Sequence, residues 1–250
     1  MNFSRRIAAA VIMTVAVLHS AAALSLEPLS HTFGVTAEER VRTFQVTNTQ
    51  DQRISVRIRM LGRDLLPDGR ELREEAADDW LVFPRQMTLE PGTTQAVRVQ
   101  YRGNGEIQTE LAYRIIAEQL PVDFSGGQRS SGINVLFRYE GSVYVAPPGA
   151  RPELVLTTAE TQRDNETGQV LVRFENRGTA HGILNDLSLE LELRNTDGEV
   201  LDELTVSEEE LPVLGGANLL AGRSLEERVD LPPSWSAGTI HVAYTVDLLQ

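Results

Sequence analysis

Hydrophobic and polar residues alternate along most of this chain in short runs, which is the pattern of half-buried β-strands. Clear runs occupy residues 42–47, 54–60, 96–101 and 112–120. Residues typical of turns separate them, as at 48–52, 67–69, 91–92 and 103–105. No long helical periodicity is present. The pattern therefore predicts an all-β fold of the sandwich type rather than a parallel α/β sheet.

The alternating pattern stops at residues 146–152, which read APPGARP, and then begins again. The second set of runs covers residues 154–156, 168–174, 183–193, 199–206, 224–229 and 239–248. Each set fills about 100 to 125 residues, which is a normal size for a sandwich domain. We therefore predict a first domain at residues 23–147 and a second β-sandwich domain at residues 148–250.

The first 22 residues are typical of a secretory signal peptide. Arg5 and Arg6 give a positive start, residues 7–18 form an apolar run, and residues 20–23 are small. Cleavage after Ala22 and cleavage after Ala23 fit equally well. The apolar run is short for a membrane span, and no later stretch is long enough to cross a bilayer. We expect an exported protein without membrane insertion after signal removal.

The composition narrows the classes of function. The chain has no cysteine, which excludes thiol catalysis and cysteine-bound metal. Its formal net charge is -13, and removing the signal peptide lowers this to -15, which argues against nucleic acid and anionic membranes as partners. All 23 basic residues are arginine. A GC-rich genome and adaptation to high salt both explain the lack of lysine, and the sequence leaves both open.

Enzymatic signals are weak. His31, His181 and His241 are widely spaced and form no metal-binding pattern, and no nucleophile elbow or phosphate-binding glycine loop is present. Trp80 and Trp235 are better explained by packing than by sugar binding. We therefore predict that the protein is not an enzyme and holds no metal or cofactor.

The most informative strand lies within residues 132–146, GINVLFRYEGSVYVA. The period of two places Ile133, Val135, Phe137 and Tyr139 on one side of it. A glycine- and serine-rich segment at 125–132 precedes this strand, and Pro147-Pro148 follows it. From the pattern alone, the strand can belong to the protein's own core or can pair with another protein.

Three further motifs carry a family resemblance through their order and spacing. In the first motif, Leu24-Ser25-Leu26 is followed by Phe33. In the second, Pro84 and Leu89-x-Pro91-Gly92 are followed by Val97-Arg98. In the third, residues 110–114 lead to a hydrophobic residue and a proline at 120–121. Together they resemble the periplasmic chaperones of the chaperone–usher pilus pathway. The resemblance implies two immunoglobulin-like β-sandwich domains in a bent arrangement, and it covers the whole chain after the signal, more weakly beyond Pro147.

The resemblance also implies a mechanism. Chaperones of this family hold a pilus (fimbrial) subunit by inserting their own strand, called G1, into the subunit's open groove, and present it to an outer-membrane usher in the periplasm. The matching strand here is residues 132–146, so Ile133, Val135, Phe137 and Tyr139 are the expected inserted residues. A tandem immunoglobulin-like module for extracellular adhesion or structure is the alternative.

The chain departs from the family at the expected anchor for the subunit's terminal carboxylate. The family's Arg and Lys anchor positions fall at Ser30 and near Ser142, which indicates a divergent branch resembling the archaic systems. A carboxylate in the cleft still needs a cationic partner. Arg114 is the first candidate because its strand is expected beside G1, and the alternative is that it pairs with a neighbouring acid. The next candidates are Arg138 and Arg98.

Glu110 matches an acidic position that helps to fix the two domains in the family. The usual arginine partner falls near Ala146 in this chain. The family's bridge therefore cannot form, and we expect Glu110 either to pair with another arginine or to face water.

Overall fold

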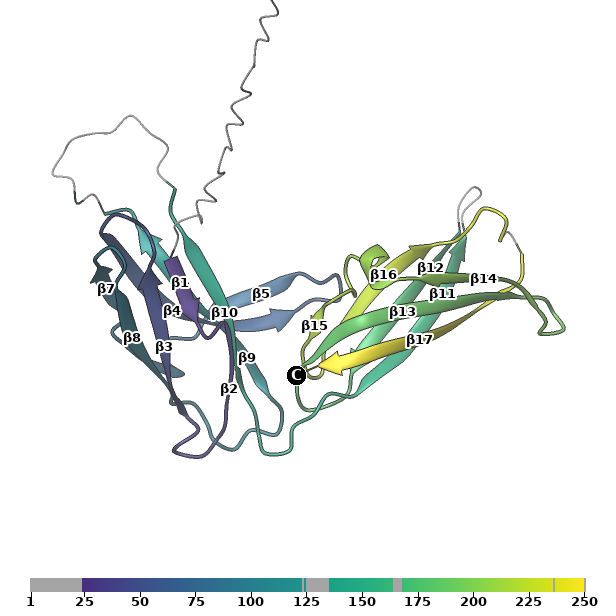
Figure 1. Cartoon of the computed structure of the whole chain (residues 1–250). Helices are drawn as coiled ribbons and strands as arrows, with labels where there is room; N and C mark the ends of the chain where they lie inside the picture. Colours follow the sequence, from purple (N-terminus) through teal and green to yellow (C-terminus); the bar gives the residue numbers. More distant parts are fainter. Residues whose placement is uncertain (1–23, 123, 125–134, 164–167, 236, 250) are drawn as a thin grey trace, which may run out of the picture.

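The computed structural model describes residues 24–122, 124, 135–163, 168–235 and 237–249. These residues form an almost purely β structure with two sandwiches that meet at an angle, the first formed by β1 to β10 and the second by β11 to β17 (Figure 1). The predicted signal peptide and Ile133 lie outside the described residues. Among the residues described, no helix is long and apolar enough to span a bilayer.

The first sandwich consists of two sheets. One sheet has the order β1 (Leu24–Glu27), β3 (Val41–Asn48), β8 (Thr94–Tyr101) and β6 (Trp80–Phe83). The other has the order β2 (Ser30–Phe33), β10 (Arg138–Val145), β9 (Leu111–Leu120), β4 (Ile54–Leu65) and β5 (Glu71–Glu75), and β7 (Gln86–Leu89) also pairs with β4.

The second sandwich also consists of two sheets. The smaller sheet has the order β11 (Leu154–Arg163), β12 (Gly168–Asn176) and β16 (Ser224–Asp230). In the other sheet, β13 (Gly182–Arg194) pairs with β14 (Val200–Val206), β15 (Asn218–Leu219) and β17 (Thr239–Leu249), and a short 3-10 turn spans Glu208–Glu210. The proline-rich break at 146–152 falls between β10 and β11.

Alternating side chains of the facing sheets build each core. In the first sandwich, the fully buried Trp80 ring meets Tyr101 and Tyr113 edge-on, with ring centroids 5.2 Å away in both cases. In the second sandwich, Trp235 is 2% exposed and its indole N–H donates to Asp202 Oδ2 at 2.8 Å. Both tryptophans therefore serve packing.

One hairpin reaches out of the first sandwich toward the second (Figure 1). β4 is twelve residues long, and its last five pair with β5, so the hairpin at residues 61–75 extends beyond the first core. We call this hairpin the arm. Leu65, near its tip, packs in the core of the second sandwich, and the backbone N–H of Glu226 donates to Pro67 O at 2.7 Å. The sequence pattern predicts a turn at the tip but does not predict β5.

Glu110 and His181 join the two sandwiches, and this result corrects the partners expected for Glu110. Its carboxylate is 3% exposed and lies 2.7 Å from His181 Nδ1, and the backbone N–H of His181 donates to the same oxygen at 3.0 Å. The His181 ring stacks on Tyr144 at 3.8 Å. Glu110 therefore neither pairs with an arginine nor faces water, because a buried histidine from the second sandwich satisfies it.

Candidate functional site

The candidate site begins with the backbone of β10. One edge of β10 pairs with β9 along its whole length, from Arg138 opposite Glu118 to Val145 opposite Leu111. The other edge pairs with β2, in parallel, only from Ser142 to Val145. Among the described residues, no strand pairs with Arg138–Glu140 on this side. We call the backbone of Arg138–Glu140 on this side the open edge.

The open edge stops at Ser142 for a definite reason. The N–H of Ser142 donates to Leu29 O at 2.7 Å, just before β2 begins. Gly141 permits this approach, because a Cβ there would lie 3.0 Å from Leu29 O and 2.9 Å from Ile115. Backbone groups alternate in direction along a strand, so those of Glu140 and Arg138 point to the same side as those of Ser142. A strand added to the open edge must therefore end where β2 starts.

One face of residues 135–145 carries the odd-numbered side chains, and their exposure increases from Val145 back to Val135. Val143 and Val145 are fully buried in the first core, Phe137 and Tyr139 are partly buried against it, and Val135 is 56% exposed. Residues 135–137 lie before β10, which starts at Arg138, so the observed strand is shorter than the predicted one. Phe137 and Tyr139 thus contribute partly to the protein's own core, whereas Val135 does not.

Arg114 lies on β9 directly beside Ser142, at the end of the open edge. Its Nη1 donates to Ser142 Oγ at 2.6 Å. Its Nε and Nη2 donate to the two carboxylate oxygens of Glu71, at 3.0 and 2.6 Å, in the forked geometry typical of arginine–carboxylate pairs. The guanidinium is 18% exposed. The alternative expected for Arg114, an ion pair with a neighbouring acid, is therefore what the structure contains.

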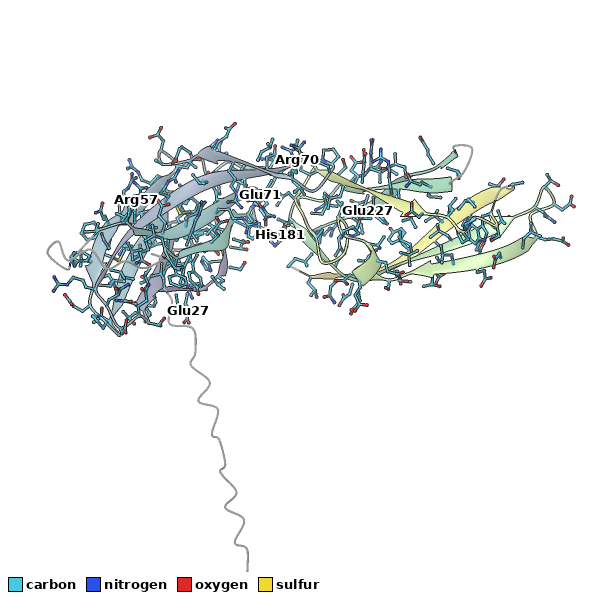
Figure 2. All side chains as sticks on the ribbon, turned by 90° about the horizontal axis from the view of Figure 1, so that it is seen from above. Glu27, Arg57, Arg70, Glu71, His181 and Glu227 are labelled. Atoms are coloured by element: carbon cyan, nitrogen blue, oxygen red, sulfur yellow. The ribbon has the colours of Figure 1, made fainter. Side chains whose placement is uncertain are left out.

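Two more arginines converge on Glu71, which comes from the arm. Nε of Arg63 and Nε of Arg73 each donate to this carboxylate at 2.7 Å. We call Arg63, Arg73 and Arg114 with Glu71 the arginine cluster. Arg73 also contacts Glu140 on β10, with Nη1 2.9 Å from Oε2. Figure 2 shows Glu71 and His181 in the middle of the molecule, whereas Arg57 lies over the first sandwich.

The cluster leaves an excess of positive charge at one point of an acidic protein. Burial alone would raise the pKa of Glu71, but the hydrogen bond from Arg114 and the charges of Arg63 and Arg114 lower that pKa to about 2. Glu71 is therefore a carboxylate at any physiological pH. Three guanidinium groups surround it, so the site is chemically suited to holding carboxylates.

The other anchor candidates have different surroundings. Arg138 lies on the same face of β10 as Ser142, and its Nε is 2.9 Å from Glu140 Oε1. Ser30, the family's arginine position, is the register partner of Ser142. Arg98 lies on β8, in the opposite sheet, between the inward-facing Val97 and Val99, so it does not join Arg114.

Sequence reasoning missed Glu71, Arg63 and Arg73. The segment ELREE at residues 71–75 has no alternation of apolar and polar residues, so it gave no strand signal. The available signal was the turn at Pro67-Asp68-Gly69 followed by four charged residues in five. Such a segment is typical of an edge strand protected by charge.

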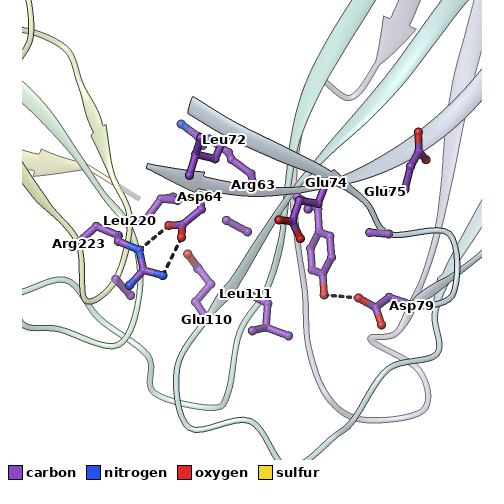
Figure 3. Close-up of a pocket in the computed structure, with 15 residues that line it drawn as sticks. Arg63, Asp64, Leu72, Glu74, Glu75, Asp79, Glu110, Leu111, Leu220 and Arg223 are labelled. Atoms are coloured by element: carbon purple, nitrogen blue, oxygen red, sulfur yellow. Dashed lines mark hydrogen bonds and ion pairs between the residues drawn. The ribbon is translucent and has the colours of Figure 1, made fainter. Parts of the chain in front are cut away.

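A cavity of about 430 Å³ lies between the first sandwich, its arm and the second sandwich. Its lining includes Asp64, Glu74, Asp79 and Glu110, and Figure 3 shows Arg223 of the second sandwich forking onto Asp64. The hydrogen bond from Arg223 lowers the pKa of Asp64. Tyr113 donates to Asp79 Oδ2 at 2.9 Å. The Arg223–Asp64 pair ties the arm to the second sandwich, whereas the Tyr113–Asp79 pair lies within the first.

The fold and the site define a class of protein: a pair of immunoglobulin-like sandwiches with a partly open strand edge next to a carboxylate-binding cluster. Residues 26–151 match the family described as pili and flagellar-assembly chaperone, PapD N-terminal domain. The match spans half of the chain, and the chain belongs to this family. The predicted kinship with pilus chaperones, which are not enzymes, is confirmed.

Solved structures agree on the fold. In the chaperone–tip adhesion subunit pre-assembly complex CsuC–CsuE from archaic chaperone-usher Csu pili of Acinetobacter baumannii, the matching chain is 16% identical with a TM-score of 0.58, over 91% of this chain and 97% of that chain. The class 5 fimbriae chaperone CfaA is 12% identical with a TM-score of 0.54, over 90% and 98%. The E. coli chaperone DraB is 16% identical with a TM-score of 0.52, over 88% and 87%.

These likenesses confirm the predicted all-β, two-domain immunoglobulin-like arrangement. A search of curated proteins gives no match.

Proposed function

We propose that this protein is a periplasmic chaperone that binds pilus subunits by adding a strand to them and delivers them to an outer-membrane usher. Membership of the chaperone family and the likeness to a chaperone in complex with a tip subunit support this role. The observation that carries the strand proposal is the open edge, whose backbone groups pair with no strand among the described residues and which ends at a cluster able to bind a carboxylate.

The inserted residues are Ile133, Val135, Phe137 and Tyr139, of which Ile133 lies outside the described residues. Val135 fills no space in the chaperone's own core, so a subunit groove is the apolar surface available to it. Burying a side chain of this kind stabilises a complex by about 1.5–3 kcal/mol. Phe137 and Tyr139 stabilise the complex less than this, because the protein's own core already covers part of their side chains.

The subunit's terminal carboxylate is the proposed ligand of Arg114. β2 runs parallel to β10, and a subunit strand that keeps this direction along the open edge has its C-terminal end at Ser142. Arg114 Nη1 is already 2.6 Å from Ser142 Oγ, so its guanidinium lies within reach of that end. Glu71 occupies two of its donors, so the incoming carboxylate replaces Glu71 or binds beside it.

Val135→Asp tests the strand. We expect this change to abolish co-purification with a subunit encoded beside the chaperone gene, because it would bury an unpaired carboxylate in an apolar groove. The matched control is Leu201→Asp on β14, where the side chain is 59% exposed. Equal recovery of the subunit with both variants contradicts strand donation and favours an adhesion module.

Arg114→Ala tests the anchor. A charge-assisted hydrogen bond contributes about 1.5–3 kcal/mol, so subunit affinity should fall by about 10- to 100-fold. Arg59→Ala is the control, because Arg59 lies on the neighbouring strand and pairs with Glu75 and Glu118. A subunit with extra residues after its C-terminus should lose the same affinity with the wild-type chaperone. If that extension has no effect, the carboxylate is not the ligand.

A further inference from the structure

The second sandwich has one strand edge that nothing in the described part of the chain covers. β17 pairs with β13 over almost all of its eleven residues, from Thr239 opposite Arg194 to Leu249 opposite Ile183. Within the residues described, its other edge has no paired strand. Figure 1 shows β17 along the side of the second sandwich, ending where the two sandwiches meet. Its backbone groups on this side are therefore free to pair with a further strand.

Other strand edges of the protein carry the usual protection against pairing. β5 has four charged residues in five, β14 carries Asp202 and Glu203, and β16 carries charges over most of its length. β11 is interrupted by a bulge between Leu156 and Thr158. β1, β6 and β7 are only four residues long. β17 is long, contains no proline, and has one acid, Asp247; the irregularity in its ladder adds a residue on β13, between Asn185 and Ser188.

The two faces of β17 differ in character. Its inward face carries apolar residues that are only partly buried because the strand lies at the side of the sandwich: Ile240, Val242, Tyr244, Val246 and Leu248. Its outward face is exposed and has two ionisable groups, His241 and Asp247. A neighbouring strand would complete the burial of the apolar row and would face one histidine and one aspartate.

We propose that the partner of this edge is β17 of a second copy of the chain, paired antiparallel about a two-fold axis at Tyr244. Tyr244 is the middle residue of β17, so this register overlaps all eleven residues of both strands. It sets Ile240 opposite Leu248 and Val242 opposite Val246, which joins the two apolar rows.

The same register sets His241 opposite Asp247, and the two-fold axis makes this pair twice. Opposite residues in an antiparallel pair of strands project from the same face of the sheet. The numbers of two opposite residues must therefore add up to an even number if both apolar rows are to lie on one face. The nearest shifts that keep this sum even place His241 opposite Thr245 or Leu249, and neither sets the imidazole opposite a carboxylate. The register with the greatest overlap is therefore also the register that pairs imidazole with carboxylate, and this coincidence favours a second copy over an unrelated strand.

The charges already present around the edge are compatible with this pairing. On β13, Glu192 lies opposite His241 and Asn185 lies opposite Asp247. Arg194 binds Glu192, with Nε 2.8 Å from Oε2. His241 in the dimer would thus lie between two acids. Asp247 lies opposite an asparagine on β13, and in the dimer it would gain the imidazole of His241 from the second copy as a partner.

A charge-swap experiment tests both the interface and its register. Sedimentation equilibrium of the signal-free chain should show a monomer–dimer equilibrium. His241→Asp replaces two attractive pairs with two repulsive ones, so the dissociation constant should rise about fivefold or more. The double change His241→Asp with Asp247→His restores the pairs in reversed order, and its dissociation constant should return to within about twofold of the wild-type value.

His241→Asp also sets a carboxylate opposite Glu192 on β13, so the melting temperature of the monomer should fall slightly, whereas Asp247→His alone, opposite Asn185, should leave it unchanged. A chain that stays monomeric at its highest soluble concentration overturns the proposal. So does a dimer that is unaffected by His241→Asp but lost with Val135→Asp, because that dimer would use the strand before β10. A double variant as weak as the single variant overturns the register.

Discussion

At the residue scale, the position of Glu71 dominates the chemistry of the candidate site. Its carboxylate accepts hydrogen bonds from Arg63, Arg73 and Arg114, and it comes from an arm that the sequence did not predict. A carboxylate with a low pKa and three arginine partners contributes to stability as well as to function, so removing it has two separable consequences.

The first consequence is a pH-dependent loss of stability. The pKa of Glu71 is about 2 in the folded chain against an ordinary 4.5, so its carboxylate stabilises the fold above about pH 4.5. This contribution, about 3 kcal/mol, is lost as the pH falls from 4.5 to about 2. Urea unfolding of Glu71→Gln should therefore differ most from wild type at neutral pH and converge with it in acid.

Glu75→Gln is the control for this measurement, because Glu75 lies on the same strand and its side chain is 60% exposed. It should change stability little at any pH. A constant difference between Glu71→Gln and wild type across the whole pH range would show that the carboxylate's charge is not the cause.

The second consequence concerns ligand binding and depends on the proposed anchor. In Glu71→Gln, Arg114 keeps its bond to Ser142 but loses its internal ion pair, so subunit affinity should rise even though the chaperone is less stable. Binding measured near neutral pH by calorimetry checks this. A fall in affinity would mean that Glu71 positions Arg114 rather than competing for it.

Part of this site could be predicted from the sequence and its family resemblance. The resemblance places the anchor position near Ser142 and Arg114 on the strand beside it, and the two residues do lie side by side. Glu71 could not be placed, because its position depends on how far the β4–β5 hairpin extends. That extension follows from packing against the second sandwich and not from any local pattern.

At the element scale, the arm connects the site with the domain interface. Leu65 is 8% exposed and packs in the second core, so Leu65→Ala should destabilise the protein by about 2–5 kcal/mol. We expect calorimetry to show the two sandwiches unfolding less cooperatively in this variant. Leu72→Ala, at a 47% exposed position on the same arm, is the control and should leave the transition unchanged.

The strand pattern predicted most of the elements and failed where function or packing intervenes. Alternation placed β3, β8 and β9 within two residues of their observed bounds and found the start of β4, but it missed the last five residues of β4. The strand before Pro147 begins at Arg138, later than predicted, because the side chains of residues 135–137 are buried little by the protein's own core. A segment with apolar alternation but little internal packing is suited to pairing with another protein.

At the scale of the whole molecule, the angle between the sandwiches rests on buried polar contacts. His181 and Glu110 satisfy each other with side-chain exposures of 5% and 3%, and Tyr144 accepts a hydrogen bond from Asn218 at 2.6 Å. The sequence showed that two domains exist, yet it gave no sign of His181. A lone histidine has no pattern that reveals its partner across an interface.

His181→Ala should leave the buried Glu110 carboxylate with the backbone N–H of residue 181 but without the imidazole. Such a loss costs about 1–3 kcal/mol, and more for a charged group. Small-angle scattering should then show a wider range of angles between the sandwiches. His241→Ala, at an exposed position on β17, should change neither the stability nor the scattering of the monomer. Unchanged scattering from His181→Ala would assign the angle to the arm instead.

The ion pair between Arg114 and Glu71 has a consequence for the ionic conditions under which the protein can work. If a subunit carboxylate takes the place of Glu71, one anion is exchanged for another and the charge around Arg114 does not change. Association with an unoccupied cationic site weakens as salt screens the attraction, whereas an exchange of this kind changes much less with ionic strength. An acidic chaperone without lysine could thereby bind its subunit at high as well as at low ionic strength.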